Sequence, residues 1–231
     1  MEQHTKQVMI KIERLSKSFG ELSVLEDINL EVNRGEFVVF FGVNGCGKST
    51  MLRIIAGLEK PTSGSVCLQG EVGFITQEMS LFPWRNVEEN ISFGLEIKGI
   101  KDRKKIIEKY IDLFLLKGFE KYYPRDLSGG MKQKLVLSRT LAVNPSIILM
   151  DEPFSNMDKD SKSIMRREFF ETWKKIKKTI VFVTHDLEEA VFLADKIFLF
   201  SKKKPTKILQ KFNCFQGKEI VKSEIERLYL N

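Results

Sequence analysis

The chain has 231 residues, enough to bury a hydrophobic core in one large domain or two small ones. Apolar residues make up 42% and charged residues 30%, so the composition excludes a fibrous or disordered protein. The 38 basic and 31 acidic residues give a net charge of +7, which suits anionic lipid, nucleic acid or nucleotide phosphates equally well. Charge by itself therefore selects no class of partner.

No stretch approaches the roughly 18 uncharged apolar residues that a transmembrane helix needs. Residues 1–15 are polar and lack the apolar core of a secretory signal, so we expect the protein to stay in the cytosol. Cys46, Cys67 and Cys214 are widely spaced and form no CxxC pair. This pattern predicts neither a disulfide framework nor a zinc site.

The first two predicted strands alternate apolar and polar residues, at 8–15 (VMIKIERL) and 23–32 (SVLEDINLEV). Together they predict an antiparallel layer. Residues 37–41 (FVVFF) are apolar throughout, as in a strand buried on both faces, and a glycine loop and a helix over 48–58 follow them. Strand, loop and helix in this order are what a phosphate-binding loop requires.

Further along, 146–152 and 178–186 indicate two more short buried strands, each ending in charged residues ahead of a helical pattern. Strands that alternate with helices predict an α/β fold with a largely parallel sheet. The tail predicts a strand pair over 196–213 and a terminal helix over 217–231.

Residues of about 86–142 contain several helical patterns and no convincing strand, which predicts an inserted α-helical sub-domain. We therefore expect a single domain over 1–231. Its core would comprise about 1–85 and 143–231.

The glycine loop GVNGCGKS, Gly42 to Ser49, fits the GxxxxGKS pattern. Its glycines allow backbone N–H groups to curl round a β-phosphate, Lys48 can reach the β and γ oxygens, and Ser49 can ligate magnesium. Cys46 lies inside this loop and near a helix N-terminus, where a thiol becomes more reactive. We expect saturating MgATP to protect that thiol from alkylation.

The strand IILMDE delivers Asp151 to its carboxyl end, where this carboxylate can hold the magnesium shell. Glu152 comes next and could orient or deprotonate an attacking water. Acidic pairs after a strand also cap helices, and this alternative stays open on local sequence.

His185 follows the strand TIVFVT, and Gln77 follows the strand in GFITQE. A side chain at the end of a strand in a nucleotide fold points into the ligand crevice. His185 could then contact a γ-phosphate or the catalytic water, and the Gln77 amide could contact magnesium or that water. A lone histidine is more often just a satisfied polar residue.

Residues 127–130 (LSGG) precede a helical run and offer a second anion cradle through Ser128, the amides after Gly129 and the positive end of the helix. The loop at 42–50 already fills the one cradle that a mononucleotide site needs. A phosphate at Ser128 would then belong to a nucleotide on another copy of the chain, and two copies would sandwich two ATP molecules. An ordinary helix N-cap by Ser128 is the alternative.

Taken in order, GVNGCGKST, Gln77, LSGGMKQ, IILMDEP, SNMD and THD resemble the motifs of the ATP-binding subunit of an ABC transporter. The resemblance covers essentially the whole chain, and the LSGGxxQ element is diagnostic of this class. It implies an ABC ATPase fold: a P-loop NTPase with a mixed β-sheet core, an antiparallel β sub-domain and an inserted α-helical sub-domain. ATP and Mg²⁺ are the implied cofactors.

The family further implies a head-to-tail dimer in which Ser128 and Gly130 of one copy complete the γ-phosphate site of the other. Phe19 stands where the family places the aromatic that stacks on adenine, and Asp158 ends a loop that crosses the dimer interface. That loop reads SNMD where most relatives have SALD. Asn156 and Met157 thus put the fine packing of the interface in doubt.

The expected site residues fall into three overlapping groups. The catalytic group is Glu152, His185, Lys48 and Gln77, and the metal group is Ser49, Gln77 and Asp151. The nucleotide-binding group is Phe19, Gly42, Val43, Asn44, Gly45, Cys46, Gly47, Lys48, Ser49, Thr50, Gln77, Ser128, Gly129, Gly130, Asp158 and His185.

Residues 80–99 (SLFPWRNVEENISFGLEIKG) and the SKKKPTKI segment are similar to importer ATPases of the nitrate, sulfonate and taurine group. In that group a groove beside the glutamine loop receives a helix of the membrane subunit. Leu81, Phe82 and Trp84 would form such an apolar seat, although aromatic residues near a turn are as often local core.

The resemblance implies integral membrane permease subunits, a second ATPase copy and an extracytoplasmic solute-binding protein as partners. It places the chain on the cytoplasmic face of the membrane, and no nucleic acid is expected. The alternative is a soluble ABC ATPase acting in DNA repair, translation or iron-sulfur assembly. Only eighty residues separate the phosphate loop from LSGG, and no long coiled coil or second cassette appears, so that alternative fits less well.

Overall fold

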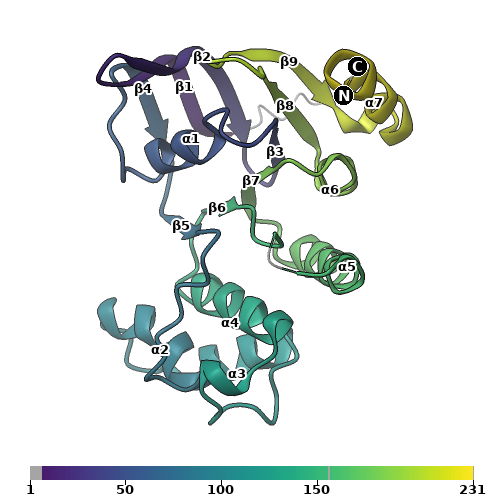
Figure 1. Ribbon diagram of the computed structural model, residues 1–231. Helices are drawn as coiled ribbons and strands as arrows, with labels where there is room; N and C mark the ends of the chain where they lie inside the picture. Colours follow the sequence, from purple (N-terminus) through teal and green to yellow (C-terminus); the bar gives the residue numbers. More distant parts are fainter. Residues whose placement is uncertain (1–6, 156, 231) are drawn as a thin grey trace, which may run out of the picture. The chain divides into compact units, whose positions relative to one another are not determined.

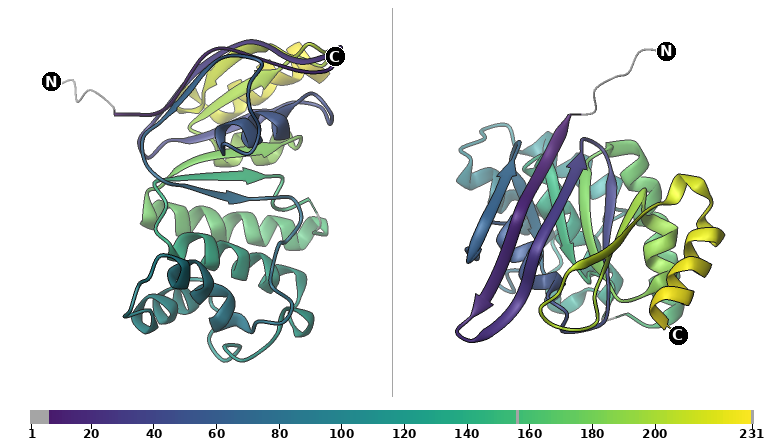
Figure 2. Two further views of the ribbon diagram at one scale, coloured as in Figure 1. Left: turned by 90° about the vertical axis from the view of Figure 1, so that its left-hand side faces the viewer. Right: turned by 90° about the horizontal axis from the view of Figure 1, so that it is seen from above.

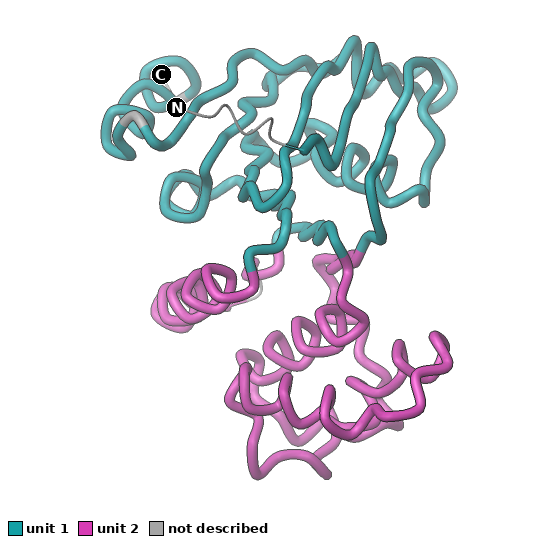
Figure 3. The backbone as a smooth tube through the Cα atoms, turned by 180° about the vertical axis from the view of Figure 1, so that it is seen from behind, with its two compact units in different colours: residues 1–72, 146–152, 177–231 teal, residues 73–145, 153–176 magenta. Residues whose placement is uncertain are grey.

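The computed structural model describes residues 7–155 and 157–230, and Figure 1 shows the course of the chain. The chain forms two compact units (Figure 3). Unit 1 comprises residues 1–72, 146–152 and 177–231, and unit 2 comprises 73–145 and 153–176. Within the described part of the chain, no helix combines the length and the apolar character needed to span a membrane.

Unit 1 contains a three-stranded antiparallel sheet in the order β2-β1-β4. Strands β1 (Val8–Phe19) and β2 (Leu22–Asn33) confirm the predicted antiparallel layer, although each strand is longer than its apolar alternation indicates. Strand β4 (Ser63–Leu68) pairs with β1 and was not predicted. Five of its six residues are exposed, so it has no buried apolar face to leave a pattern in the sequence.

A larger sheet in unit 1 runs in the order β6-β7-β3-β8-β9 (Figure 2). Strands β6 (Ile147–Asp151), β7 (Thr179–Thr184), β3 (Phe37–Phe41) and β8 (Lys196–Phe200) are parallel, and β9 (Ile208–Asn213) is antiparallel to β8. Every residue of β3, β6 and β7 is buried, which explains why these strands read as continuous apolar runs. The predicted mixed sheet is confirmed.

The described residues of unit 1 form the helices α1 (Lys48–Ile55), α6 (Leu187–Leu193) and α7 (Lys218–Ile225). Helix α1 ends just before Gly57, whose φ of 72° lies in the left-handed region that glycine adopts readily. A short 3₁₀ turn η2 (Cys214–Gln216) precedes α7, which packs against α6 and continues into the π-helical turn η3 (Glu226–Leu230). The predicted strand pair and helix at the end of the chain are confirmed.

The chain passes from unit 1 to unit 2 within β5 (Val72–Ile75). Unit 2 is helical, with α2 (Val87–Ile97), α3 (Lys104–Leu113), the turn η1 (Pro124–Asp126), α4 (Gly129–Ala142) and α5 (Lys159–Ile176). Helices α2 and α3 both pack on α4. This unit also takes in 73–85 and 153–176, so the sub-domain limits of about 86–142 stay a prediction.

Candidate functional site

The glycine loop connects β3 to α1, and its glycines are needed for identifiable reasons. Gly45 and Gly47 have φ values of 78° and 103°, which L-residues rarely adopt. A Cβ atom on Gly42 would lie 2.9 Å from the Cys46 Sγ, 3.1 Å from the Phe200 Cβ and 3.3 Å from the Tyr229 hydroxyl. The loop is therefore a tight backbone turn packed against the carboxyl-terminal part of unit 1.

Lys48 is the first residue of α1, and its side chain folds back into the loop. The residue is only 4% exposed, and Nζ donates hydrogen bonds to the carbonyl oxygens of Gly42 (2.8 Å) and Val43 (2.9 Å). An ammonium group has three N–H donors, and beyond these two carbonyls the Cys46 Sγ lies 4.0 Å from Nζ as a weak acceptor. The arrangement keeps a positive charge inside the ring of loop backbone, where a phosphate would be attracted.

The reactivity predicted for Cys46 is wrong. Its thiol is 2% exposed, and burial raises the pKa of this cysteine above its ordinary value despite the nearby charge of Lys48. Desolvation penalises the thiolate more than the loop and Lys48 stabilise it. Cys46 acts in the loop as a small packing residue, with Sγ facing the Cα of Gly42.

Ser49 and Asp151 join α1 to the carboxyl end of β6. The Ser49 Oγ donates a 2.9 Å hydrogen bond to Oδ1 of Asp151. Burial raises the pKa of the Asp151 carboxyl, and the charge of Glu152 adds to this, whereas the Ser49 hydrogen bond opposes it. The hydroxyl and carboxylate oxygens are hard ligands, as Mg²⁺ prefers, and Mg²⁺ commonly binds one such carboxylate together with substrate phosphates. These two residues fit the predicted magnesium site.

Glu152 and His185 lie side by side beyond the ends of β6 and β7. His185 Nδ1 is 3.0 Å from Glu152 Oε2. Glu152 has a φ of 44°, a sparsely populated conformation for a non-glycine residue, and its N–H donates to the Val183 carbonyl. The next helix begins only at Lys159, so neither Asp151 nor Glu152 caps it.

The remaining loop residues of the predicted set, Val43, Asn44 and Thr50, lie in the glycine loop and the first turn of α1. Phe19 ends β1 with its ring 48% exposed. The Lys17 Nζ lies 4.5 Å from the ring centroid and is fixed by the Glu59 carboxylate at 2.6 Å. Phe19 thus presents one aromatic face to solvent in unit 1.

Gln77 belongs to unit 2 and lies two residues beyond the end of β5. Its amide Nε2 is 3.5 Å from the hydroxyl of Ser155, in the same unit. The side chain is exposed.

Ser128 caps α4, because its hydroxyl accepts a hydrogen bond from the Met131 N–H at 3.3 Å. The N-cap interpretation therefore fits. Among residues 7–155 and 157–230, nothing explains the two glycines that follow. Neither has a positive φ, a Cβ on Gly129 would meet no described atom within 4 Å, and one on Gly130 would make ordinary contacts with Met165 and Met157. Residues without side chains at these positions leave the helix N-terminus open to a ligand.

Beside this helix end unit 2 contains a cavity of about 370 Å³. Asp158 is on its rim and caps α5, with Oδ1 accepting from the Ser161 N–H at 2.9 Å, a hydrogen bond that lowers the pKa of the Asp158 carboxyl. Asn156 lies outside the described residues. The cavity is lined by Ser128, Gly129, Gly130, Met131, Lys134, Met157, Asp158, Ser161, Ile164, Met165 and Glu168.

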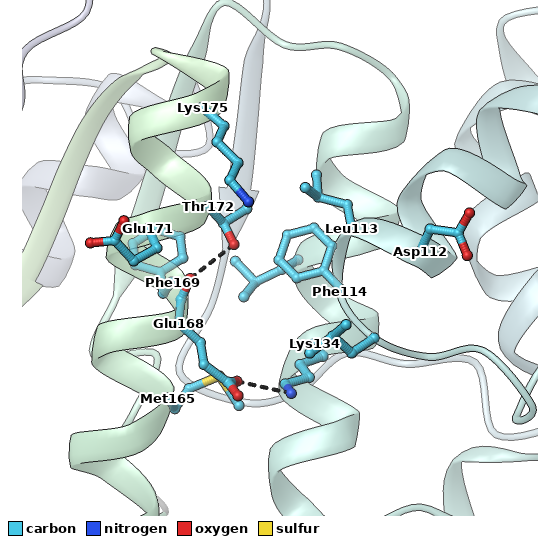
Figure 4. A pocket seen from close by; sticks show the side chains of 12 residues that line it. Asp112, Leu113, Phe114, Lys134, Met165, Glu168, Phe169, Glu171, Thr172 and Lys175 are labelled. Atoms are coloured by element: carbon cyan, nitrogen blue, oxygen red, sulfur yellow. Dashed lines mark hydrogen bonds and ion pairs between the residues drawn. The ribbon is translucent and has the colours of Figure 1, made fainter.

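A second cavity of about 270 Å³, which the sequence did not indicate, lies between α3, α4 and α5 (Figure 4). It shares Lys134, Met165 and Glu168 with the first, and the Lys134 Nζ and Glu168 Oε2 atoms are 2.9 Å apart. This ion pair links the helix that Ser128 caps to α5.

The predicted apolar seat divides into a packed and an exposed part. Phe82 packs on Phe93 with ring centroids 4.4 Å apart, and both its backbone N–H and its carbonyl are bonded to the Asn90 side chain. Trp84 is 70% exposed, with its ring centroid 5.7 Å from that of Phe82. Phe82 is half-buried and packed within its own segment, whereas Trp84 is exposed and can contact a partner.

The parallel sheet and the glycine loop at the carboxyl end of β3 define a P-loop nucleotide-binding protein. Residues 25–155 match a family model described as ABC transporter. The chain is 44% identical to an uncharacterized ABC transporter ATP-binding protein of Methanocaldococcus jannaschii, over 95% of this chain and 84% of that protein. The chain therefore belongs to the ABC transporter family as an ATP-binding protein, an ATPase coupled to transport.

Other relatives carry more specific names. The chain is 41% identical to an aliphatic sulfonates import ATP-binding protein of Bacillus thuringiensis subsp. konkukian, over 81% of this chain and 78% of the relative. It is also 41% identical to a nitrate import ATP-binding protein of Synechocystis, over 81% and 74%. A putative metal-chelate type ABC transporter in an inward-facing conformation matches the fold with a TM-score of 0.80 at 24% identity, over 91% of this chain and 85% of that one.

Proposed function

We propose that ATP binds with its phosphates in the loop 42–50 and that Glu152 and His185 act on the attacking water. The observation that carries this proposal is the 2.9 Å hydrogen bond from Ser49 to Asp151, which joins the loop helix to the strand that ends in Glu152. Lys48 supplies positive charge, and the positive φ of Gly45 and Gly47 lets the loop backbone curve round an anion. Phe19 offers its exposed ring to adenine.

Mg²⁺ would be held by Ser49 and Asp151 and would neutralise charge on the phosphate oxygens, and the role of Gln77 as a metal ligand stays a prediction. Glu152 would accept a proton from the attacking water, and His185 would orient that carboxylate through Nδ1. The geometry of the Glu152 and His185 pair is already set by the ends of two adjacent buried strands. Catalysis in this site rests mainly on positioning and charge neutralisation.

A second copy of the chain would complete the site through Ser128, Gly129 and Gly130, with Asp158 at the contact. This is supported by the glycines of α4, which no contact among the described residues requires, and by the cavity beside them. ATP would close the two copies and hydrolysis would reopen them.

The chain would energise import of a small solute through a membrane permease, on the cytoplasmic face of the membrane and with an extracytoplasmic solute-binding protein. The names of its sulfonate and nitrate importing relatives support this, and they make a small oxyanion or sulfonate the best substrate class. The exposed Trp84 would contact the permease.

The sequence left open a soluble ABC ATPase role in DNA repair, translation or iron-sulfur assembly, which the matches to transporter ATPases do not support. Purification of the tagged chain from detergent-solubilised membranes of its own cells separates the two. Co-purification of a multi-span membrane protein supports the importer. Nucleic acid or soluble assembly factors in its place would contradict the importer.

A further inference from the structure

Two side chains from the carboxyl-terminal part of unit 1 hold the backbone of the glycine loop. The hydroxyl of Tyr229, in η3, accepts a 2.9 Å hydrogen bond from the Val43 N–H. The hydroxyl of Thr206 donates a 2.5 Å hydrogen bond to the Cys46 carbonyl. We call Tyr229 and Thr206 the loop clamp. Neither residue belongs to a phosphate-binding motif, and each lies more than 150 positions from its partner in the sequence.

Both members of the loop clamp are fixed in place. Tyr229 is 1% exposed, its ring packs on Phe41 with centroids 5.7 Å apart, and the Lys202 Nζ lies 5.0 Å from the ring centroid. Thr206 is fully buried, and its backbone bonds to the Val24 carbonyl and the Glu26 N–H of β2. Residues held in this way can impose a conformation on the loop.

The contacts of the loop clamp complement those of Lys48. The Val43 peptide donates to Tyr229 through its N–H and accepts from the Lys48 Nζ through its carbonyl. Without Tyr229 the early part of the loop would be held mainly by Lys48, whose ammonium must also serve a phosphate. Thr206 holds the later part at Cys46, next to Gly47, which packs on Val24 and Leu25.

We propose that Tyr229 and Thr206 are positioning residues that keep the phosphate loop in its binding conformation independently of Lys48. The inference rests on the proposed function, since it assumes that this loop receives phosphate. The loop clamp aligns the loop amides before the nucleotide arrives, so its loss weakens binding more than turnover. A buried N–H or carbonyl group that loses its only hydrogen-bond partner costs desolvation free energy. The loop can lower this cost by moving so that the group reaches water, and it then leaves its binding conformation.

The test uses Tyr229→Phe and Thr206→Val, which remove one hydroxyl each and keep the volume. Tyr110→Phe is the matched control, since Tyr110 is a buried tyrosine of unit 2. In the nucleotide-free protein, amide hydrogen exchange of peptides covering 42–50 should be at least about threefold faster in both clamp variants and unchanged in the control. Calorimetric titration with MgADP should give a Kd about tenfold higher for Tyr229→Phe, and the KM for ATP should rise while kcat changes less than about twofold.

The proposal would be overturned if Tyr229→Phe matched the wild type in both measurements. That result would be an amide exchange rate of 42–50 and a Kd for MgADP that each lie within twofold of the wild-type value. Faster exchange with unchanged affinity would overturn the positioning role as well. If Tyr229→Phe does not fold, amide exchange of 42–50 and the Kd for MgADP are measured on Thr206→Val instead, and the same criteria apply to the proposal. Failure of the proposed function looks different, because MgADP would then fail to slow exchange of 42–50 in the wild type itself.

Discussion

His185 Nδ1 lies 3.0 Å from Glu152 Oε2, although 33 positions separate the two residues in the sequence. Glu152 extends β6 and His185 extends β7, and these strands are parallel neighbours in the sheet. The Glu152 side chain is 14% exposed and that of His185 is 45% exposed, so the carboxylate is sheltered and the imidazole faces solvent. The pair resembles the base-and-orienting-group arrangement of many hydrolytic sites.

Replacing Glu152 by glutamine should slow ATP hydrolysis by at least about 10²-fold while ATP binding survives. The amide keeps the size and the contact to His185 but cannot accept a proton from water. Dimers should therefore accumulate in ATP, as size-exclusion chromatography with MgATP would show. Glu188→Gln, in the exposed first turn of α6, is the matched control and should hydrolyse ATP normally. Near-normal turnover in Glu152→Gln would remove Glu152 from the mechanism.

Asp151→Asn should make the nucleotide-free protein more stable while abolishing Mg²⁺-dependent hydrolysis. Burial holds the pKa of the Asp151 carboxyl above its unfolded value, so the folded state binds the proton more tightly and the ionised form destabilises it. This destabilisation is fully present when the pH is above the pKa of Asp151 in the folded protein. It decreases as the pH falls through that pKa toward the pKa of the unfolded chain, which is near 3.9.

The melting temperature of Asp151→Asn should thus exceed that of the wild type at pH 7, without nucleotide or Mg²⁺. The difference should shrink on acidification. Differential scanning calorimetry between pH 7 and pH 4 measures it. A variant less stable than the wild type at pH 7, or a gap that widens in acid, would contradict the role of burial.

Cys46 should react slowly with iodoacetamide, with or without MgATP, because its thiol is buried and its pKa is raised. Cys67 is exposed and provides the internal control. Mass spectrometry of peptides after brief alkylation should find Cys67 modified at least about tenfold more than Cys46, and both modified equally in guanidinium. Rapid labelling of Cys46 that MgATP suppresses would restore the reactivity predicted from the sequence.

Gly129→Ala should fold normally yet lose ATP-driven dimerisation and hydrolysis. A Cβ at this position meets no atom of the described residues within 4 Å, and alanine favours a helix over glycine by up to about 1 kcal/mol. The methyl group would instead stand between the helix amides and an approaching phosphate. The melting temperature should not fall and the ATP affinity of the monomer should be unchanged, which separates this effect from misfolding. Normal dimerisation would show that the glycine faces no second copy.

Trp84→Ala should reduce recovery of the permease with the tagged chain by at least about fivefold, because exposed aromatic side chains commonly anchor protein interfaces. Ile97→Ala removes another exposed apolar side chain of unit 2 and serves as the control. Membrane co-purification compares them at equal expression. Equal recovery from the two variants would exclude Trp84 from the permease contact.

The sequence predicted the parts of the fold whose pattern is local. Phe37–Phe41 and Ile147–Asp151 are buried on both faces of a parallel sheet, so each is a continuous apolar run that can be recognised without its neighbours. Strand β4 could not be found in this way, since it is an exposed strand of serine, glycine and scattered apolar residues.

The site was predictable as a set of residue types, but its contacts were not. The loop pattern identifies where backbone amides face an anion, yet it says nothing of what covers the other side of the loop. Cys46 proved buried there because the loop packs near Phe200 and Tyr229, from distant strands and turns. Tyr229 and Thr206 carried no motif, since their role depends on one hydroxyl each meeting the loop across the fold.

The division into two compact units has a spectroscopic consequence. The chain contains two tryptophans, Trp84 and Trp173, and both lie in unit 2, where Trp173 stacks on Phe170 at a centroid distance of 5.6 Å. Intrinsic indole emission should therefore follow the unfolding of unit 2 alone, whereas far-ultraviolet circular dichroism follows both units. In urea titrations, an indole transition at lower urea than the circular dichroism transition would reveal that the helical unit melts while the β-sheet unit persists.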